Sequence, residues 1–286
     1  MASVQDEVAL IKAESERLGE YLRGLPQDAW SRPSACDRWG VRDVVAHQVW
    51  VAEFYADTIS RGMQGDVTSP DGSVYAEFAT SKESFHQFIA RSAIARRESL
   101  GQGLLEAFSS GFDRLNRLMA ALGPQDWSKP CSFWHFLGPI PAQGFIGLTI
   151  QELVIHEWDI RSGLDPSPRV SEDSLPALLD RIPTRLSLPQ LAAFRLNFAP
   201  AGPVRYRFSV TGPVPSTHDI VVENNKCRME PAGTSMADVT LRCDTDTFVL
   251  LMYQRLPLDT ATGSGRLMVE GDQALVSAFD RWLKGE

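Results

Sequence analysis

The chain has 286 residues, and its 28 Lys and Arg against 36 Asp and Glu give a formal net charge of −8 at pH 7. Apolar residues make up 43% of the chain and charged residues 22%, which is typical of folded proteins with about two domains at this length. The negative charge argues against non-specific nucleic-acid binding, and the apolar stretches are too short and too polar to span a membrane.

Helical periodicity dominates the chain before residue 165. Apolar residues recur with helical spacing over 7–25, 41–59, 85–122 and 145–162. Gly123-Pro124 ends the third of these segments, and Gly163, with Pro166 beyond it, ends the fourth. Four helices with apolar faces predict an antiparallel bundle over residues 1–165, and bundle cores are a common place for metal and ligand sites.

The remainder of the chain has a different pattern. A further helix over 171–186 belongs to a predicted helical linker, residues 166–200. Strand patterns follow at 204–211, at 219–229 with a turn at Asn224-Asn225, in VTLRCDT and in GRLMVEG; helical patterns cover 246–253 and the residues from Asp272 onward. Residues 201–286 are therefore predicted to form a small α+β domain, which makes the fold class α plus α+β.

Cysteine usage and the amino terminus bear on location. The four cysteines are far apart and form no CxxC pair; they are Cys36, Cys131, Cys227 and Cys243. Such cysteines suit reduced thiols rather than a disulfide framework. No basic region followed by an apolar run marks a signal peptide at the start. We expect a cytoplasmic protein.

Two of the five histidines lie within predicted helices among apolar residues. These are His47 and His156, and Glu152 precedes His156 by four residues. This spacing places Glu152 and His156 one turn apart on one helix face. With His47 from another bundle helix they would form a two-histidine, one-carboxylate set with an open position, which suits catalytic Zn²⁺ but also Fe²⁺, Mn²⁺, Ni²⁺ or Co²⁺.

The spacing alone leaves simpler interpretations open. A Glu and a His four residues apart also form ordinary helix ion pairs, and a single His among apolar residues is commonly a core residue with a satisfied hydrogen bond. The segment Glu-Leu-Val-Ile-His differs from the HExxH motif of zinc proteases.

Two segments carry a resemblance to a known family. CDRWGVRDVVAHQVWVAEF (36–54) and LTIQELVIHEWDIRSG (148–163) resemble the two signatures of the mycothiol-dependent maleylpyruvate isomerases, a branch of the DinB-like metal-binding four-helix bundles. The resemblance implies that His47, Glu152 and His156 are metal ligands. It covers about residues 5–186.

The second domain carries a resemblance of its own. ADVTLRCDTDTFVLLMYQ and GRLMVEGDQALVSAFDRWL look like the sterol-carrier-protein-2 (SCP2) fold, the usual carboxy-terminal partner in that family. In the family an arginine from this domain reaches the active site, and Arg266 is the best positional match. The alternative is that Arg266 is a surface charge at a strand edge.

The resemblance implies an enzyme with a divalent metal, most simply Zn²⁺, that activates mycothiol as a thiolate. The thiolate would add to a cis double bond and leave again, which is isomerisation, or attack an electrophilic carbon and stay, which is S-transfer. Loop-rich extra length at 61–82, 125–143 and 186–218 puts maleylpyruvate itself in doubt as the substrate. The expected partners are a small electrophile and the thiol, with no nucleic acid or membrane, and the chain is a monomer or homodimer.

Two other function classes remain open. The chain could be a lipid or small-molecule carrier with a vestigial metal site, or a metal-dependent hydrolase with Glu157 or Asp159 as general base. Asp159 could instead hold a metal ligand through a hydrogen bond. Cys36, which has no adjacent base in sequence, and His135, in an aromatic loop, are secondary candidates.

Overall fold

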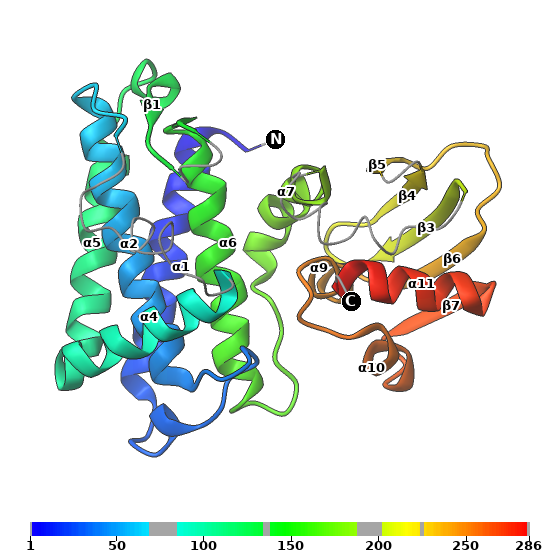
Figure 1. Cartoon of the computed structure of the whole chain (residues 1–286), viewed down its shortest axis with the longest axis horizontal. Coiled ribbons are helices and arrows are strands. Elements are labelled where there is room, and N and C mark those ends of the chain that lie inside the picture. Colours follow the sequence, from blue (N-terminus) through cyan, green and yellow to red (C-terminus); the bar gives the residue numbers. More distant parts are fainter. Residues whose placement is uncertain (1, 69–84, 134–137, 188–201, 224–225, 285–286) are drawn as a thin grey trace. The chain divides into compact units, whose positions relative to one another are not determined.

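The chain divides into two compact units, Met1–Arg169 and Val170–Glu286 (Figure 1). The computed structural model describes residues 2–68, 85–133, 138–187, 202–223 and 226–284. The first unit is helical and the second combines helices with a mixed sheet, so the predicted fold class is confirmed. Within the described residues, every helix is too short or too polar to cross a bilayer.

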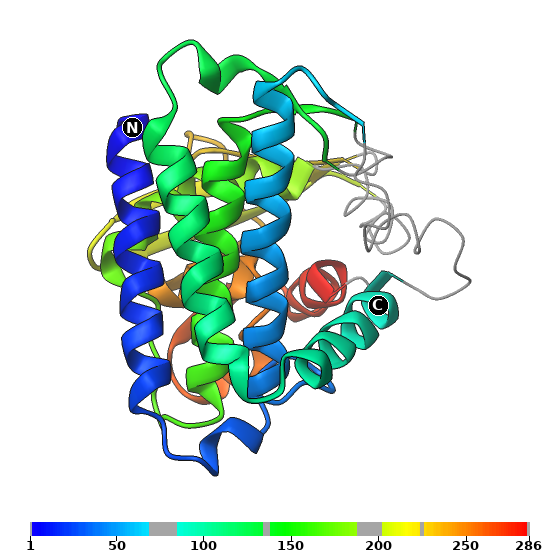
Figure 2. The same cartoon turned by 90° about the vertical axis from the view of Figure 1, so that its left-hand side faces the viewer.

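A four-helix bundle forms the first unit. Its helices are α1 (Val4–Gly24), α2 (Val41–Met63), α5 (Leu104–Ala121) and α6 (Gly144–Ser162). Helices α1 and α2 each pack against both α5 and α6, and Figure 2 shows the four running side by side. Between them lies an apolar core to which Leu18, Val45, Leu115 and Ile150 all contribute fully buried side chains.

One helix prediction in this unit was wrong. Residues 85–122 form two helices, α4 (Phe85–Leu100) and α5, separated by the 3₁₀ turn η2 (Gly101–Gly103). Gly101 has φ +52°, in the left-handed region that favours glycine, and this turn ends the first helix. As a result α4 packs against the side of α2 instead of extending α5.

Short elements connect the helices. The 3₁₀ turns η1 (Ala29–Ser31) and η3 (Asp126–Ser128) follow α1 and α5. Strands β1 (Pro130–Cys131) and β2 (Ile140–Pro141) pair antiparallel before α6. The predicted loops at 61–82 and 125–143 fall partly on residues 69–84 and 134–137, which are outside the described residues.

Buried charges join α1 to α6. Glu157 is 4% exposed, and its carboxylate accepts hydrogen bonds from Arg17 on α1 and from Arg161 one turn along α6. Arg17 also pairs with Glu14, which is 3% exposed, and the Arg161 guanidinium lies 3.7 Å from the centre of the Tyr21 ring. Since each buried carboxylate has an arginine partner, this network holds the two helices together without leaving a bare charge in the interior.

The second unit is an α+β fold. Its helices are α7 (Leu175–Ser187), preceded by η4 (Glu172–Ser174), then α9 (Thr245–Met252), α10 (Leu258–Gly263) and α11 (Gln273–Lys284). Its strands are β3 (Val204–Thr211), β4 (Ser216–Glu223), β5 (Lys226–Pro231), β6 (Val239–Asp244) and β7 (Leu267–Gly271), in the order β5-β4-β3-β6-β7. Among the strands that the structure describes, β3 and β6 pair in parallel and the other neighbours pair antiparallel.

Four strand patterns were predicted for this unit, and five strands form close to the predicted positions. The segment 219–229 forms two antiparallel strands, β4 and β5, and the predicted turn at Asn224-Asn225 lies outside the described residues. Helix α7 follows the predicted position within the linker 166–200, of which residues 188–200 are also outside the described part.

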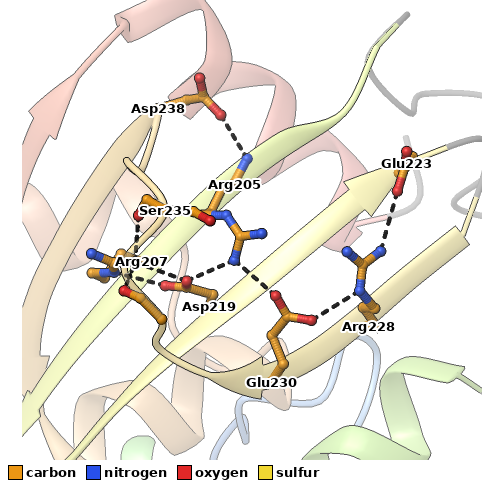
Figure 3. Close-up of polar contacts among 9 residues, drawn as sticks. Arg205, Arg207, Asp219, Glu223, Arg228, Glu230, Ser235 and Asp238 are labelled. Atoms are coloured by element: carbon orange, nitrogen blue, oxygen red, sulfur yellow. Dashed lines mark hydrogen bonds and ion pairs between the residues drawn. The ribbon is translucent and has the colours of Figure 1, made fainter.

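The sheet has one apolar and one charged face. Tyr206 and Phe208 point to the apolar face, where Phe208 packs against Phe248 of α9 and Phe279 of α11. On the other face, arginines of β3 and β5 form hydrogen bonds with carboxylates of β4 and β5. Figure 3 shows these contacts of Arg205, Arg207 and Arg228 with Asp219, Glu223 and Glu230. Hydrogen bonds from the two β3 arginines keep the pKa of the buried Asp219 below its usual range.

We expect Arg17→Met to destabilise the helical unit by roughly 2–3 kcal/mol, below the 3–5 kcal/mol for a fully buried pair, because Arg161 still contacts Glu157. Urea unfolding followed by helical circular dichroism measures this. Lys12→Met on the same helix is the matched control: Lys12 pairs with Glu16 at the surface, so its loss costs at most about 1 kcal/mol. Equal midpoints for the two variants would contradict a structural role for the network.

Candidate functional site

The three predicted ligand residues come together inside the helical unit. His47 lies on α2, and Glu152 and His156 lie one turn apart on α6. Glu152 Oε2 is 3.2 Å from His47 Nε2 and 3.3 Å from His156 Nε2. One ligand atom from each residue lies within 4.8 Å of the others, although the two helices are about 100 residues apart in sequence.

The cluster is largely shielded from solvent, since the side chains of His47, Glu152 and His156 are 11%, 21% and 12% exposed, and this partial burial shapes its protonation. Burial lowers the pKa of His47 below its ordinary value, and the Glu152 carboxylate opposes that shift only in part. Burial alone would raise the pKa of Glu152, but hydrogen bonds from His156 and His47 hold it below its usual range. Glu152 is therefore the anionic centre of the cluster, with an imidazole on either side.

The second ring nitrogen of His156 has its own partner. Nδ1 lies 2.8 Å from Oδ2 of Asp159, which is completely buried. The same Oδ2 accepts from the Cys36 thiol at 3.1 Å. Although burial disfavours the charged imidazole, the Asp159 contact raises the pKa of His156 well above its ordinary value. Because a carboxylate only accepts hydrogen bonds, His156 donates from Nδ1 to Asp159, and its raised pKa favours the imidazolium, whose Nε2–H faces Glu152.

Gly163 allows the loop that carries Cys36 to lie close to the carboxyl end of α6. The Ala35 backbone N–H donates to the Asp159 carbonyl at 3.0 Å, so the loop lies against the end of α6. At Gly163, just past that end, a Cβ atom would collide with the Pro33 carbonyl oxygen. Its φ of −84° is ordinary, so space rather than backbone conformation requires glycine here.

Further contacts fix α2 against α6 around the cluster. Gln48 is fully buried, and its side-chain amide donates to the Glu152 carbonyl at 2.9 Å. Two tryptophan rings flank the histidines: Trp39 is 5.2 Å from His47 between ring centres, and Trp50 stacks on His47 at 5.8 Å. A small cavity of about 20 Å³ lies beside His47 and Trp50.

Arg266, the predicted catalytic residue, lies in the second unit just before β7. Its Nη2 is 2.6 Å from Asp246 Oδ2, and its Nε donates to Thr247 Oγ1 at 3.1 Å. Asp246 also accepts from the Val170 backbone N–H, at the start of that unit. Within its own unit, the guanidinium therefore ties β7 to the start of α9.

Sequence reasoning left open that Asp159 holds a metal ligand, which its hydrogen bond with His156 fits, but it missed the contact of Cys36 with both residues. Cys36 has no base beside it in sequence, but folding places its sulfur 3.7 Å from His156 Nδ1. The clue in the sequence was that Asp159 follows His156 by three residues, which is one helical turn. His135 lies outside the described residues, and Glu157 faces Arg17, on the α1 side of α6.

The fold and the cluster together define a class: a four-helix bundle carrying two imidazoles and a carboxylate, followed by an α+β unit. Residues 11–161 match the model of the mycothiol maleylpyruvate isomerase N-terminal domain, and residues 198–284 match that of the SCP-2 sterol transfer family. The first match covers more than half of the chain. The chain belongs to the mycothiol maleylpyruvate isomerase N-terminal domain family and carries an SCP2 domain behind it.

Two solved structures share this arrangement. The crystal structure of the mycothiol-dependent maleylpyruvate isomerase aligns with a TM-score of 0.61 and 14% sequence identity, covering 94% of this chain and 93% of the other. A mutant of that isomerase aligns with a TM-score of 0.60 at the same identity and coverage. At this identity the likeness shows the fold alone. No curated protein sequence matches the chain.

We expect Gly163→Ala to destabilise the helical unit by about 1–3 kcal/mol, because the added methyl group forces the Pro33 loop away from α6. Thermal unfolding measures the change. Gly24→Ala at the end of α1 is the control, since a Cβ there meets no atom within 4 Å and the substitution is neutral or slightly stabilising. A Gly163→Ala variant as stable as the control would show that the loop moves aside freely.

Proposed function

We propose that this chain is a metal-dependent enzyme that activates a low-molecular-weight thiol for reaction with a small electrophile. The donor set of His47, Glu152 and His156 carries the proposal. Two ligand atoms that are each about 2.1 Å from a tetrahedral Zn²⁺ lie about 3.4 Å apart. The 3.2 Å and 3.3 Å separations of Glu152 Oε2 from the two Nε2 atoms fit that spacing.

A neighbouring group of possible ligands fits a supporting role better. Cys36, His156 and Asp159 also bring three donor atoms within 4.8 Å. However, His156 Nδ1 and Asp159 Oδ2 are 2.8 Å apart, which is hydrogen-bond distance and leaves no need for an ion between them. We therefore assign the metal to His47, Glu152 and His156, and we assign to Asp159 the task of holding His156 in the required tautomer.

When bound, a divalent metal such as Zn²⁺ would lower the pKa of a coordinated thiol, which is otherwise mostly protonated at neutral pH. The protein's own residues prepare the site. Asp159 keeps a proton of His156 at Nδ1, Gln48 holds α2 against α6, and Trp39 and Trp50 pack their rings against His47. Family membership favours mycothiol as the thiol.

Two reactions fit the same site. In cis–trans isomerisation the thiolate adds to an activated double bond, the bond rotates, and the thiol leaves unchanged. In S-transfer the thiol remains on the product. The metal ligands serve both reactions equally, so we propose an S-transferase or isomerase and leave its electrophile to assay. Arg266 is the proposed contact from the second unit, although its tie to Asp246 would first have to open.

The alternative functions are less well supported. A hydrolase needs a free general base, but Glu157 is bound to Arg17 and Arg161, and Asp159 is bound to His156 and Cys36. A carrier with a vestigial site would have no need for three convergent ligand atoms. The SCP2 match leaves lipid binding by the second unit to be tested separately. Because all four cysteines are free thiols, we propose a cytoplasmic location.

We expect purified protein to hold close to one divalent metal ion per chain, and His47→Ala or His156→Ala to lose most of it. Elemental analysis of folded samples measures this. His218→Ala is the control, because His218 lies on β4 of the second unit and touches none of the ligands. Turnover of an electrophile should require both the metal and mycothiol. Full turnover with water alone would support a hydrolase, and metal-free wild type would overturn the proposal.

We expect Asp159→Asn to weaken Zn²⁺ binding by about 10–100-fold, because the amide no longer holds the Nδ1 proton of His156 as a carboxylate does. Competition with a chromophoric chelator measures the affinity. Asp165→Asn, three residues past the end of α6, removes the same charge from a half-exposed position and should bind Zn²⁺ normally. Equal affinities would remove Asp159 from the metal site.

A further inference from the structure

Apart from the small cavity beside His47, a second, larger cavity lies where the ends of several helices of the first unit meet. Its volume is about 450 Å³, within the usual range for small-molecule sites. Residues of α1, η1, α2, α4, η2 and α5 line it, among them three arginines: Arg23, Arg42 and Arg97. None of the lining residues belongs to the cluster of His47, Glu152 and His156, so the cavity calls for an explanation of its own.

The charges in this cavity are not balanced. Arg97 is neutralised, since Nη1 is 3.3 Å from Asp43 and Nη2 is 3.0 Å from Glu98. Among the described residues, Arg23 and Arg42 have no ion pair or side-chain hydrogen bond. Arg23 and Arg42 therefore face the cavity without a carboxylate partner. The three arginines outnumber Asp43 and Glu98 by one, on a chain whose net charge is −8.

The rest of the lining is suited to an organic molecule. Leu22 and Leu104 are buried and form an apolar wall of the cavity. The half-buried indole of Trp30 adds a flat aromatic surface. The side-chain amides of Gln27 and Gln102 supply further hydrogen-bonding groups. Apolar walls with a few convergent polar groups are the common composition of a small-molecule site.

We propose that this cavity is a second binding site, for a small organic dianion with an apolar or aromatic body. Arg23 and Arg42 bind the anionic groups through charge-assisted hydrogen bonds, for which the planar guanidinium suits both phosphate and carboxylate. Leu22, Leu104 and Trp30 take the body of the ligand. The shared chemistry is the dianion; a phosphate monoester and an aromatic dicarboxylate are its two sources.

Isothermal titration calorimetry with phenyl phosphate, isophthalate and inorganic phosphate tests the proposal. We expect saturable one-to-one binding of at least one aromatic dianion, tighter than that of inorganic phosphate. The variant Arg23→Gln/Arg42→Gln should bind it at least tenfold more weakly, equivalent to about 1.4 kcal/mol. The preferred aromatic dianion identifies the source as phosphate monoester or dicarboxylate.

Two controls keep the result specific. Arg117→Gln/Arg281→Gln removes the same charge from exposed positions outside the cavity and should bind like wild type. Chelator-treated and metal-loaded wild type should bind equally, since the cavity shares no residue with the metal cluster. Binding that needs the metal, binding lost equally in both double variants, or binding of inorganic phosphate alone would each overturn the proposal. None of these outcomes depends on the proposed thiol chemistry.

Discussion

The first unit depends on a carboxylate buried between two imidazoles. Glu152 carries its charge in the interior of the bundle, where an uncompensated anion would be costly, and His47 and His156 are its partners. One partner comes from α2 and the other from α6, so compensating this charge requires the two helices to lie together. The hydrogen bond from the Gln48 amide to the Glu152 carbonyl also requires α2 and α6 to lie together. The carboxylate on which the proposed metal site depends is thus also a constraint on the packing.

Helix α6 carries the proposed metal ligands on one side and a structural ion-pair network on another. Toward α2 it presents Glu152 and His156; toward α1 it presents Glu157, paired with Arg17 and Arg161. Asp159 lies near its carboxyl end, where the loop with Cys36 is held by a backbone hydrogen bond and by the missing side chain of Gly163. Because α6 is buried on several sides, apolar residues occur all around it. The segment therefore forms a helix although its sequence has little amphipathic character.

The errors of prediction have physical causes. Helical spacing continues through 85–122, and the cost of a glycine within a helix is only about 1 kcal/mol, so the pattern favoured one long helix. Packing of α4 against α2 favours the break, and the left-handed Gly101 allows it. The contact of Cys36 with Asp159 spans 123 residues, and no local pattern predicts which loop will meet which helix end.

The sequence by itself determined the helical and α+β halves, most strands, and the pair Glu152 and His156, because these follow from local periodicity and from spacing along one helix. His47, among apolar residues of another predicted helix, was a candidate third ligand, and the family resemblance supported it. Only the tertiary structure decided the partners that lie far apart in the chain: Arg17 with Glu157, Cys36 with Asp159, and the three arginines of the second cavity. The physical reason is that burial and charge compensation act between elements after they pack, whereas periodicity acts within one element.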